Sequence, residues 1–190
     1  IQGDSTWTLA GSPYIIMKPS GRILIAQGYS LTIEPGVVVK FPGNASMLAI
    51  KGTLNAIGTD TQPITFERGD GFTERWHTIE FNGTDGEGTG TLKYCNISGG
   101  GAPQIPEEDY HAAIDCIFGA TPTIENCTIT DSEHGIYSTQ ESVPQVLNNS
   151  ITGNAGYGIY LDNSSPVITG NTINSNGMHG ILQKTEGTGA

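Results

Sequence analysis

Three stretches of the chain repeat at an interval of 22 residues, beginning at Pro122, Pro144 and Pro166. A regular interval of about 20 to 50 residues is typical of a repeat architecture, in which each unit stacks on the next. When the stretches are overlaid, apolar residues and a Gly-Ile pair coincide: Ile124, Val146 and Ile168; Ile129, Ile151 and Ile173; Gly135-Ile136, Gly158-Ile159 and Gly180-Ile181.

Within each unit, apolar and polar residues alternate, as in Thr128-Ile129-Thr130. This alternation is typical of β-strands, whose successive side chains point to opposite faces. Short strands separated by Gly and Asn at this period predict an all-β fold, a single-stranded parallel β-helix of about seven coils. A regular coil takes roughly 22 residues and stacks on the next at the spacing between strands, about 4.8 Å.

The same pattern continues toward the N-terminus, with interruptions. Cys95 matches Cys127 but lies 32 residues before it, and the extra length falls in "GGGAPQIPEEDY". We therefore predict inserted loops at about 82–91 and 98–112. The bulky segment 1–20 is expected to cap the first coil of a β-helix that spans 21–190, because a solenoid needs a covered end.

Charge and composition exclude several classes of protein. The formal net charge is -11 and only 8 residues are basic, so nucleic acid is a poor partner. The chain contains no apolar run of about 18 residues, so we expect no transmembrane segment. The acidic composition favours an extracellular or cell-surface protein, and the three cysteines do not form a disulfide framework.

The N-terminal half carries a sequence signature. The segments "LTIEPGVVVKF" and "GTLNAIGTDTQPITF", followed by Trp76, resemble exported right-handed parallel β-helix proteins of bacteria and archaea. The later "P-x-I-x-N-x-I-x-x-N-x-x-G-I" units resemble NosD-type and carbohydrate-binding/sugar-hydrolase (CASH) repeats of the pectin-lyase-like superfamily. The resemblance implies a right-handed helix, but not one function, because this superfamily includes lyases, hydrolases, adhesins and structural surface proteins.

One position recurs on four successive coils as Cys95, Cys127, Asn149 and Asn171. Asparagines stacked at a turn can hydrogen-bond along the rod, so we interpret this row as a structural ladder. Cys95 and Cys127 would be close enough for a disulfide, but buried free thiols are the favoured interpretation.

If the isoleucines of the Gly-Ile strands point inward, the residues that follow them point outward. On four coils these are Glu80, Asp115, Tyr137 and Tyr160. Tyrosine rings stack on sugars and carboxylates hold hydroxyl groups, so the row is a candidate glycan-binding site. Paired carboxylates about 5 Å apart also suit a retaining glycosidase. The alternative is an exposed face without a ligand.

Three further patterns need an interpretation. Glu107, Glu108 and Asp109 offer oxygen ligands for calcium, although a solvated loop is the favoured interpretation. The four histidines lack metal-ligand spacing, and we expect turn roles for them. Two outward rows, formed by Thr128, Ser150 and Thr172 and by Thr130, Thr152 and Asn174, resemble the flat faces of ice-binding solenoids, but threonine is also a good strand residue.

These observations favour a non-catalytic structural or adhesive protein of a cell surface. Because the residues after Leu182 include no large apolar side chain, we expect the last coil to be uncovered. Two explanations compete: the chain is a fragment of a longer protein, or its last coil joins the first coil of another copy, giving filaments. The alternative is a protein that binds or cleaves polysaccharide, as a lyase or glycoside hydrolase. No cofactor is expected, apart from calcium as a candidate structural ion.

Overall fold

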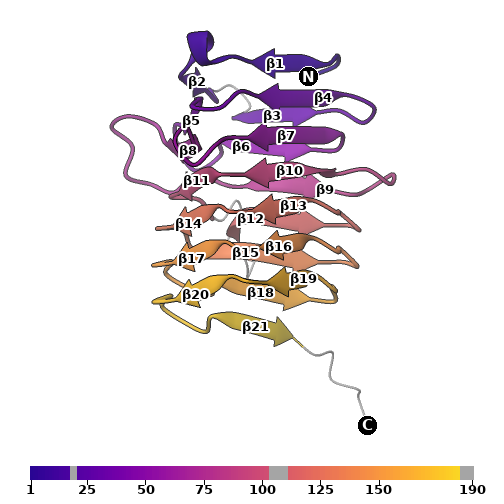
Figure 1. Cartoon of the computed structure of the whole chain (residues 1–190), viewed down its shortest axis with the longest axis vertical. Helices are drawn as coiled ribbons and strands as arrows, with labels where there is room; N and C mark the ends of the chain where they lie inside the picture. Colours follow the sequence, from indigo (N-terminus) through magenta and orange to yellow (C-terminus); the bar gives the residue numbers. More distant parts are fainter. Residues whose placement is uncertain (18–20, 103–110, 185–190) are drawn as a thin grey trace.

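The computed structural model describes residues 1–17, 21–102 and 111–184. Its strands form a rod of stacked coils that runs from β1 to β21 (Figure 1). Every coil adds one strand to each of three parallel sheets, and each sheet has seven strands. The predicted parallel β-helix of about seven coils is therefore confirmed.

The three sheets are named A, B and C in chain order. Sheet A contains β1 (Ser5–Trp7), β4 (Ser30–Ile33), β7 (Thr53–Ile57), β10 (Thr89–Lys93), β13 (Thr123–Glu125), β16 (Gln145–Leu147) and β19 (Val167–Thr169). Sheet B contains β2 (Tyr14–Ile15), β5 (Val38–Phe41), β8 (Ile64–Arg68), β11 (Cys95–Ser98), β14 (Thr128–Thr130), β17 (Ser150–Thr152) and β20 (Thr172–Asn174). Sheet C contains β3 (Arg22–Ile25), β6 (Met47–Ile50), β9 (Ile79–Asn82), β12 (Ala112–Ile117), β15 (His134–Thr139), β18 (Ile159–Asp162) and β21 (Ile181–Lys184).

The strands pair in the register that the repeat predicts. In sheet C, Ile114 lies between Ile79 and Ile136, and Ile136 lies opposite Ile159. All four side chains are at most 1% exposed, so they form one internal column. Equivalent columns run through sheet A, from Ile124 onward, and through sheet B, from Ile97 onward. Apolar burial along these columns is the main source of stability.

The glycine of the repeated Gly-Ile pair has a steric cause. A β-carbon built on Gly135 would lie 2.4 Å from the carbonyl oxygen of Gly158, and one on Gly158 would lie 2.5 Å from the carbonyl oxygen of Gly180. Both distances are below any real contact of a β-carbon. The coils approach each other so closely at this corner that only glycine fits.

The first 20 residues were expected to cap the rod. Within them, β1 pairs with β4 and β2 pairs with β5, and a short 3-10 helix, η1 (Leu9–Gly11), lies between the two strands. Trp7 and Tyr14 stack with ring centroids 4.7 Å apart. The described part of this segment therefore supplies the first strands of sheets A and B and is continuous with the helix.

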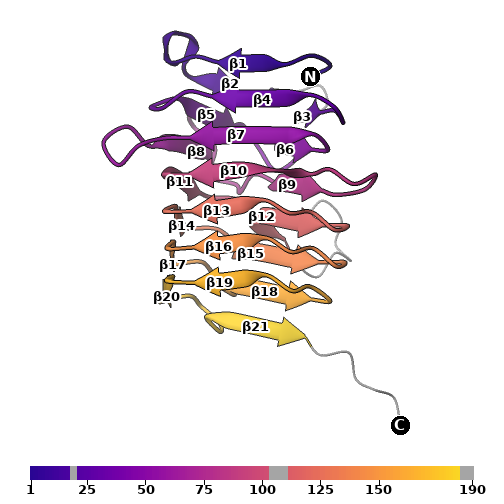
Figure 2. The ribbon, with the colours of Figure 1, turned by 45° about the vertical axis from the view of Figure 1, so that its right-hand side comes forward.

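Two connections, 69–78 and 99–111, are longer than the rest. Residues 99–111 correspond to the insertion predicted at about 98–112; residues 83–88 lie within the one predicted at about 82–91, but this connection is no longer than 58–63 or 153–158. The 69–78 connection was not predicted from the sequence, and it projects beside β8 (Figure 2). Its Trp76 returns to the rod, where the ring is fully buried and stacks on Phe41 at a centroid distance of 4.2 Å.

Across the described residues, no helix is long enough and apolar enough to cross a membrane.

Candidate functional site

The predicted glycan-binding row lies on sheet C. Asp115 is opposite Glu80 on one side and Tyr137 on the other, and Tyr137 is opposite Tyr160. The four residues therefore share one column on successive strands, β9, β12, β15 and β18. The pairing follows directly from the register of the internal isoleucines, because adjacent residues of a strand point to opposite faces.

The burial of this column differs from that of an open groove. Tyr160 is 1% exposed and Asp115 is 7% exposed, whereas Glu80 and Tyr137 are half-buried. The rings of Tyr137 and Tyr160 lie 5.3 Å apart and are tilted by 40°, so they pack against each other. Burial raises the pKa of the Tyr137 phenol. In this conformation the flat face of Tyr160 is not available to a sugar.

Both carboxylates of the column accept hydrogen bonds close to their own positions. The side-chain amide of Asn82 donates to Oε1 of Glu80 over 3.3 Å, and the backbone N–H of Ala112 donates to Oδ1 of Asp115 over 3.2 Å. These contacts orient the two side chains and help to fix the ends of β9 and β12. They satisfy part of the hydrogen-bonding capacity that a ligand would need.

A row of aromatic rings lies where the chain enters sheet C. His77, His134, Tyr157 and His179 each stand two residues before an internal isoleucine of that sheet. The ring of Tyr157 lies 5.1 Å from that of His134 and 6.1 Å from that of His179, and its backbone N–H donates to Nδ1 of His134 over 2.8 Å. The offset of two residues before Ile was visible in the sequence but was not used there.

Hydrogen bonding is incomplete at the N-terminal end of this row of rings. The rings of His77 and His111 lie 5.4 Å apart, and among the described residues Nδ1 of His77 is buried without a hydrogen-bond partner. Burial of the ring, together with the nearby His111 and Arg22, lowers the pKa of His77 to about 4. Burial also lowers the pKa of His134. Both imidazoles are therefore held in the neutral form at pH 7.

We expect this row to make the rod sensitive to acid. Above pH 6.5 His77 is neutral in both the folded and the unfolded chain, so it contributes nothing to the change of stability with pH. Between pH 6.5 and about 4 the unfolded chain binds a proton that the folded chain excludes, so stability falls as the pH falls. For His77 the loss is about 2 kcal/mol after allowing for the partial exposure of the ring. Urea unfolding at pH 7 and pH 4.5 measures it.

His77→Gln serves as the test variant, because glutamine does not titrate. It should lose less stability between the two pH values than the wild-type protein does, whereas His179→Gln, at an exposed position, should behave as the wild type. An equal loss in wild type and His77→Gln would contradict the assignment.

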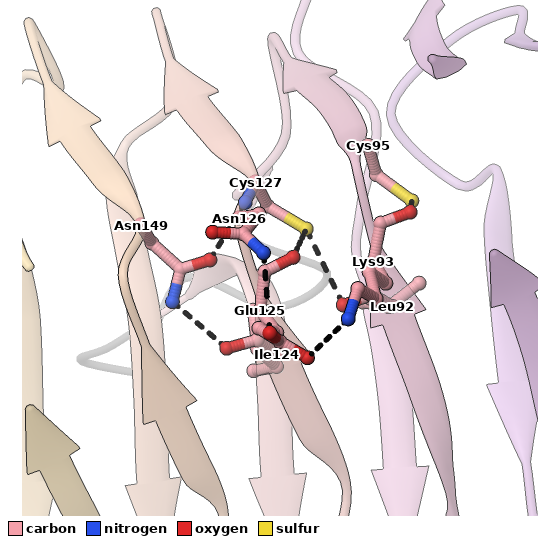
Figure 3. A network of polar contacts seen from close by, with 8 residues as sticks. All are labelled: Leu92, Lys93, Cys95, Ile124, Glu125, Asn126, Cys127 and Asn149. Carbon is pink, nitrogen blue, oxygen red and sulfur yellow. Dashed lines mark hydrogen bonds and ion pairs between the residues drawn. The ribbon is translucent and has the colours of Figure 1, made fainter. Parts of the chain in front are cut away.

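The predicted ladder residues occupy the corner between sheets A and B (Figure 3). Oδ1 of Asn149 accepts from the backbone N–H of Cys127 over 2.8 Å, while its Nδ2 donates to the carbonyl oxygen of Ile124 over 2.8 Å. Asn171 repeats this pattern one coil later, accepting from the N–H of Asn149 and donating to the carbonyl oxygen of Val146. Each asparagine thus ties its own coil to the preceding one.

A second row of the same kind lies at the corner between sheets B and C. Oδ1 of Asn154 accepts from the backbone N–H of Ser132 over 3.1 Å, and Oδ1 of Asn176 accepts from that of Asn154 over 3.1 Å. This row was not predicted from the sequence, although Asn154 and Asn176 lie 22 residues apart. Sheet B is therefore bordered on both sides by side chains that bridge successive coils.

The three cysteines are buried free thiols. Sγ of Cys95 donates to the carbonyl oxygen of Ala56 over 3.4 Å, and Sγ of Cys127 donates to that of Leu92 over 3.4 Å. Burial raises the pKa of the Cys95 thiol. Within the described part of the chain, no three His, Cys, Asp or Glu side chains are arranged to hold a metal ion. The calcium candidates Glu107, Glu108 and Asp109 lie outside the described residues.

Several charged side chains also connect one coil to another. The pairs are Lys93–Glu125 at 3.0 Å, Arg75–Glu133 at 2.8 Å, Arg68–Asp131 at 2.7 Å and Lys184–Asp162 at 3.0 Å. A cavity of about 280 Å³ is lined by Asn44, Glu74, Arg75, Gly101 and Ala102. Among the described residues that line it, Arg75 is paired with Glu133.

Together these features define a class: a β-solenoid whose polar side chains mainly connect its own coils. A comparison with protein families agrees, since residues 57–189 match the model described as "Right handed beta helix region". The match covers more than half of the chain, which therefore belongs to the right-handed β-helix family, and the handedness implied by the sequence resemblance is confirmed. No curated protein and no solved structure matches the chain.

Proposed function

We propose that this chain is a non-catalytic structural or adhesive β-helix of a cell surface, and that copies of it associate end to end. The observation that carries the proposal is the exposure of apolar side chains in the last described coil. Ile181 occupies the internal column of sheet C but is 45% exposed, whereas its neighbour one coil earlier, Ile159, is 1% exposed.

The same contrast holds in the other two sheets. Ile168 and Ile173 are only half-buried, while Val146 and Ile151, their neighbours in the preceding coil, are at most 1% exposed. In addition, β19, β20 and β21 each pair with one strand only, and no other strand within residues 1–17, 21–102 and 111–184 pairs with their second edge. Apolar side chains beside open strand edges favour the addition of further strands.

The first coil of a second copy has suitable features to occupy this end. Its strands β1, β2 and β3 also lie at the edges of their sheets, and every coil runs in the same direction. Leu9 and Met17 of the first coil are 48% and 67% exposed. A contact between unlike ends does not close on itself, so it would propagate into a filament.

Electron microscopy and light scattering of the purified protein test this association. We expect filaments or short chains of rods for the wild type, and single rods for Ile181→Lys, because a buried unpaired charge opposes the contact. Val143→Lys is the matched control, since Val143 is 44% exposed but lies at a corner on the side of the rod, between β15 and β16. Single rods for the wild type, or filaments for Ile181→Lys, would refute end-to-end association.

Glycan binding remains the alternative function. Its support is a cluster of three tyrosines, in which the ring of Tyr160 lies 5.3 Å from that of Tyr137 and 5.5 Å from that of Tyr157. The burial of Tyr160 and the hydrogen bonds of both carboxylates favour the structural role instead. Screening the wild type and Tyr137→Ala on a glycan array distinguishes the two: binding that depends on Tyr137 would favour the alternative.

A further inference from the structure

The outer face of sheet B carries a regular array of short uncharged side chains. Two columns cross the strands β11, β14, β17 and β20 in register. The first column consists of Asn96, Thr128, Ser150 and Thr172, and the second of Ser98, Thr130, Thr152 and Asn174. All eight side chains are exposed or half-buried and end in a hydroxyl or an amide group.

The array has a defined two-dimensional repeat. Neighbouring strands of a parallel sheet are about 4.8 Å apart, and alternate residues of one strand are about 6.6 Å apart. The columns therefore present polar atoms on a lattice with these two spacings. Most sheet surfaces interrupt such a lattice with charged or bulky residues, as this sheet itself does on β5 and β8, where Lys40 and Glu67 continue the second column.

The packing beneath and beside the array makes it rigid. Ile97, Ile129 and Ile151, the residues between the two columns, are at most 1% exposed and anchor the strands in the core. The corner residues Cys127, Asn149 and Asn171 stand immediately before β14, β17 and β20, and Ser132, Asn154 and Asn176 stand two residues after them. Both rows are tied between coils by hydrogen bonds, so both borders of the face are fixed.

The chemistry of the array limits what it can bind. The eight side chains carry no charge, which disfavours ionic minerals and nucleic acid as ligands. They include no aromatic ring, the usual contact for a polysaccharide surface. The nearest charge beside the columns on β14 is Asp131, which is neutralised by Arg68. A repeating layer of neutral donors and acceptors matches a ligand that is itself a repeating layer of donors and acceptors.

We propose that this face of sheet B binds ice. An ice surface presents oxygen atoms in regular rows, so a rigid protein face with oxygen atoms at a fixed repeat can join it at many points at once. Threonine suits this role, because its branched side chain has restricted rotamers and loses little entropy on binding. The methyl groups of the threonines add apolar contact between the hydroxyl groups. This proposal does not depend on end-to-end association.

The test measures incorporation into ice. Protein labelled at the N-terminus is placed around a slowly growing ice hemisphere, and its fluorescence in the ice is compared with that of a protein that does not bind ice. We expect enrichment of the wild type and complete loss of enrichment in Thr128→Lys, where a long charged side chain rises from the exposed middle of the array. Gln145→Lys, at an exposed position of sheet A, should remain enriched as the wild type.

The unfolding midpoints of both variants show whether the fold is intact, and Thr152→Lys provides a second disruption one coil further along. Wild-type protein that is excluded from ice overturns the proposal. So does equal enrichment of Thr128→Lys and Gln145→Lys, or sedimentation of the wild type with crystalline cellulose or chitin instead of incorporation into ice.

Discussion

Replacing Trp76 with alanine should lower the free energy of unfolding by about 4 kcal/mol, the usual cost of removing a buried tryptophan. The ring is fully buried, stacks on Phe41 with an interplanar angle of 16°, and donates a hydrogen bond from Nε1 to the carbonyl oxygen of Ser98 over 2.8 Å. Its loss would leave a cavity between β5 and β11 and one unsatisfied carbonyl group. The described part of the 69–78 connection would lose its main anchor to the rod.

Denaturant unfolding followed by far-ultraviolet circular dichroism measures this effect without relying on tryptophan fluorescence. Trp7→Ala is the matched control: Trp7 is only half-buried, lies in the first coil and stacks on Tyr14. We expect it to cost about 1 to 2 kcal/mol, since an exposed ring contributes less transfer energy. The assignment of Trp76 as an anchor fails if both variants lose the same stability.

Asn149→Ala should be nearly as costly, at about 3 kcal/mol, although it removes only a small polar group. The substitution leaves the backbone N–H of Cys127 buried without its partner and removes one hydrogen bond to the carbonyl oxygen of Ile124. Each unsatisfied buried group costs about 1 to 3 kcal/mol. Asn149 itself is 2% exposed, so water cannot easily replace the lost amide.

Asn171→Ala removes the same group from the next coil, where Asn171 is half-buried and solvent has access. We expect a loss of about 1 kcal/mol there. Thermal and urea unfolding of the two variants, compared side by side, tests the ladder. Equal effects would indicate that the amide contributes through its local turn and not through buried bonds between coils.

The candidate site shows how far the repeat alone can be taken. The 22-residue spacing predicted that Asp115 lies beside Tyr137, and the match of Ile79-Glu80 to the Gly-Ile strand predicted that Glu80 lies on its other side, because parallel strands in register place equivalent residues side by side. It could not predict that Tyr160 is covered. Burial of an outward side chain depends on the side chains packed around it, here Tyr137 of the preceding coil, whose ring lies 5.3 Å away, and Tyr157 of the same coil, whose ring lies 5.5 Å away.

Irregular segments mark the other limit. The spacing predicted one insertion after β9 and one before β12, because the period changes there by a visible amount. The 69–78 connection was passed over as part of the signature around Trp76. The second asparagine row was missed because it lies after the apolar strand residues, where polar side chains are expected in any turn. Its role became clear only when Asn154 was seen to bond to Ser132 of the preceding coil.

The sequence by itself determined the architecture: the period, the alternation and the Gly-Ile pairs are local patterns that allow one way of stacking coils. Tertiary structure alone decided which polar side chains form hydrogen bonds between coils and which remain exposed at the surface. Asn149 and Asn154 are buried ties, while Thr128 and Thr172 are exposed, although all four are polar residues beside strands. The physical reason is that hydrogen-bond partners and solvent access come from the adjacent coil, which lies 22 or more residues away in the sequence.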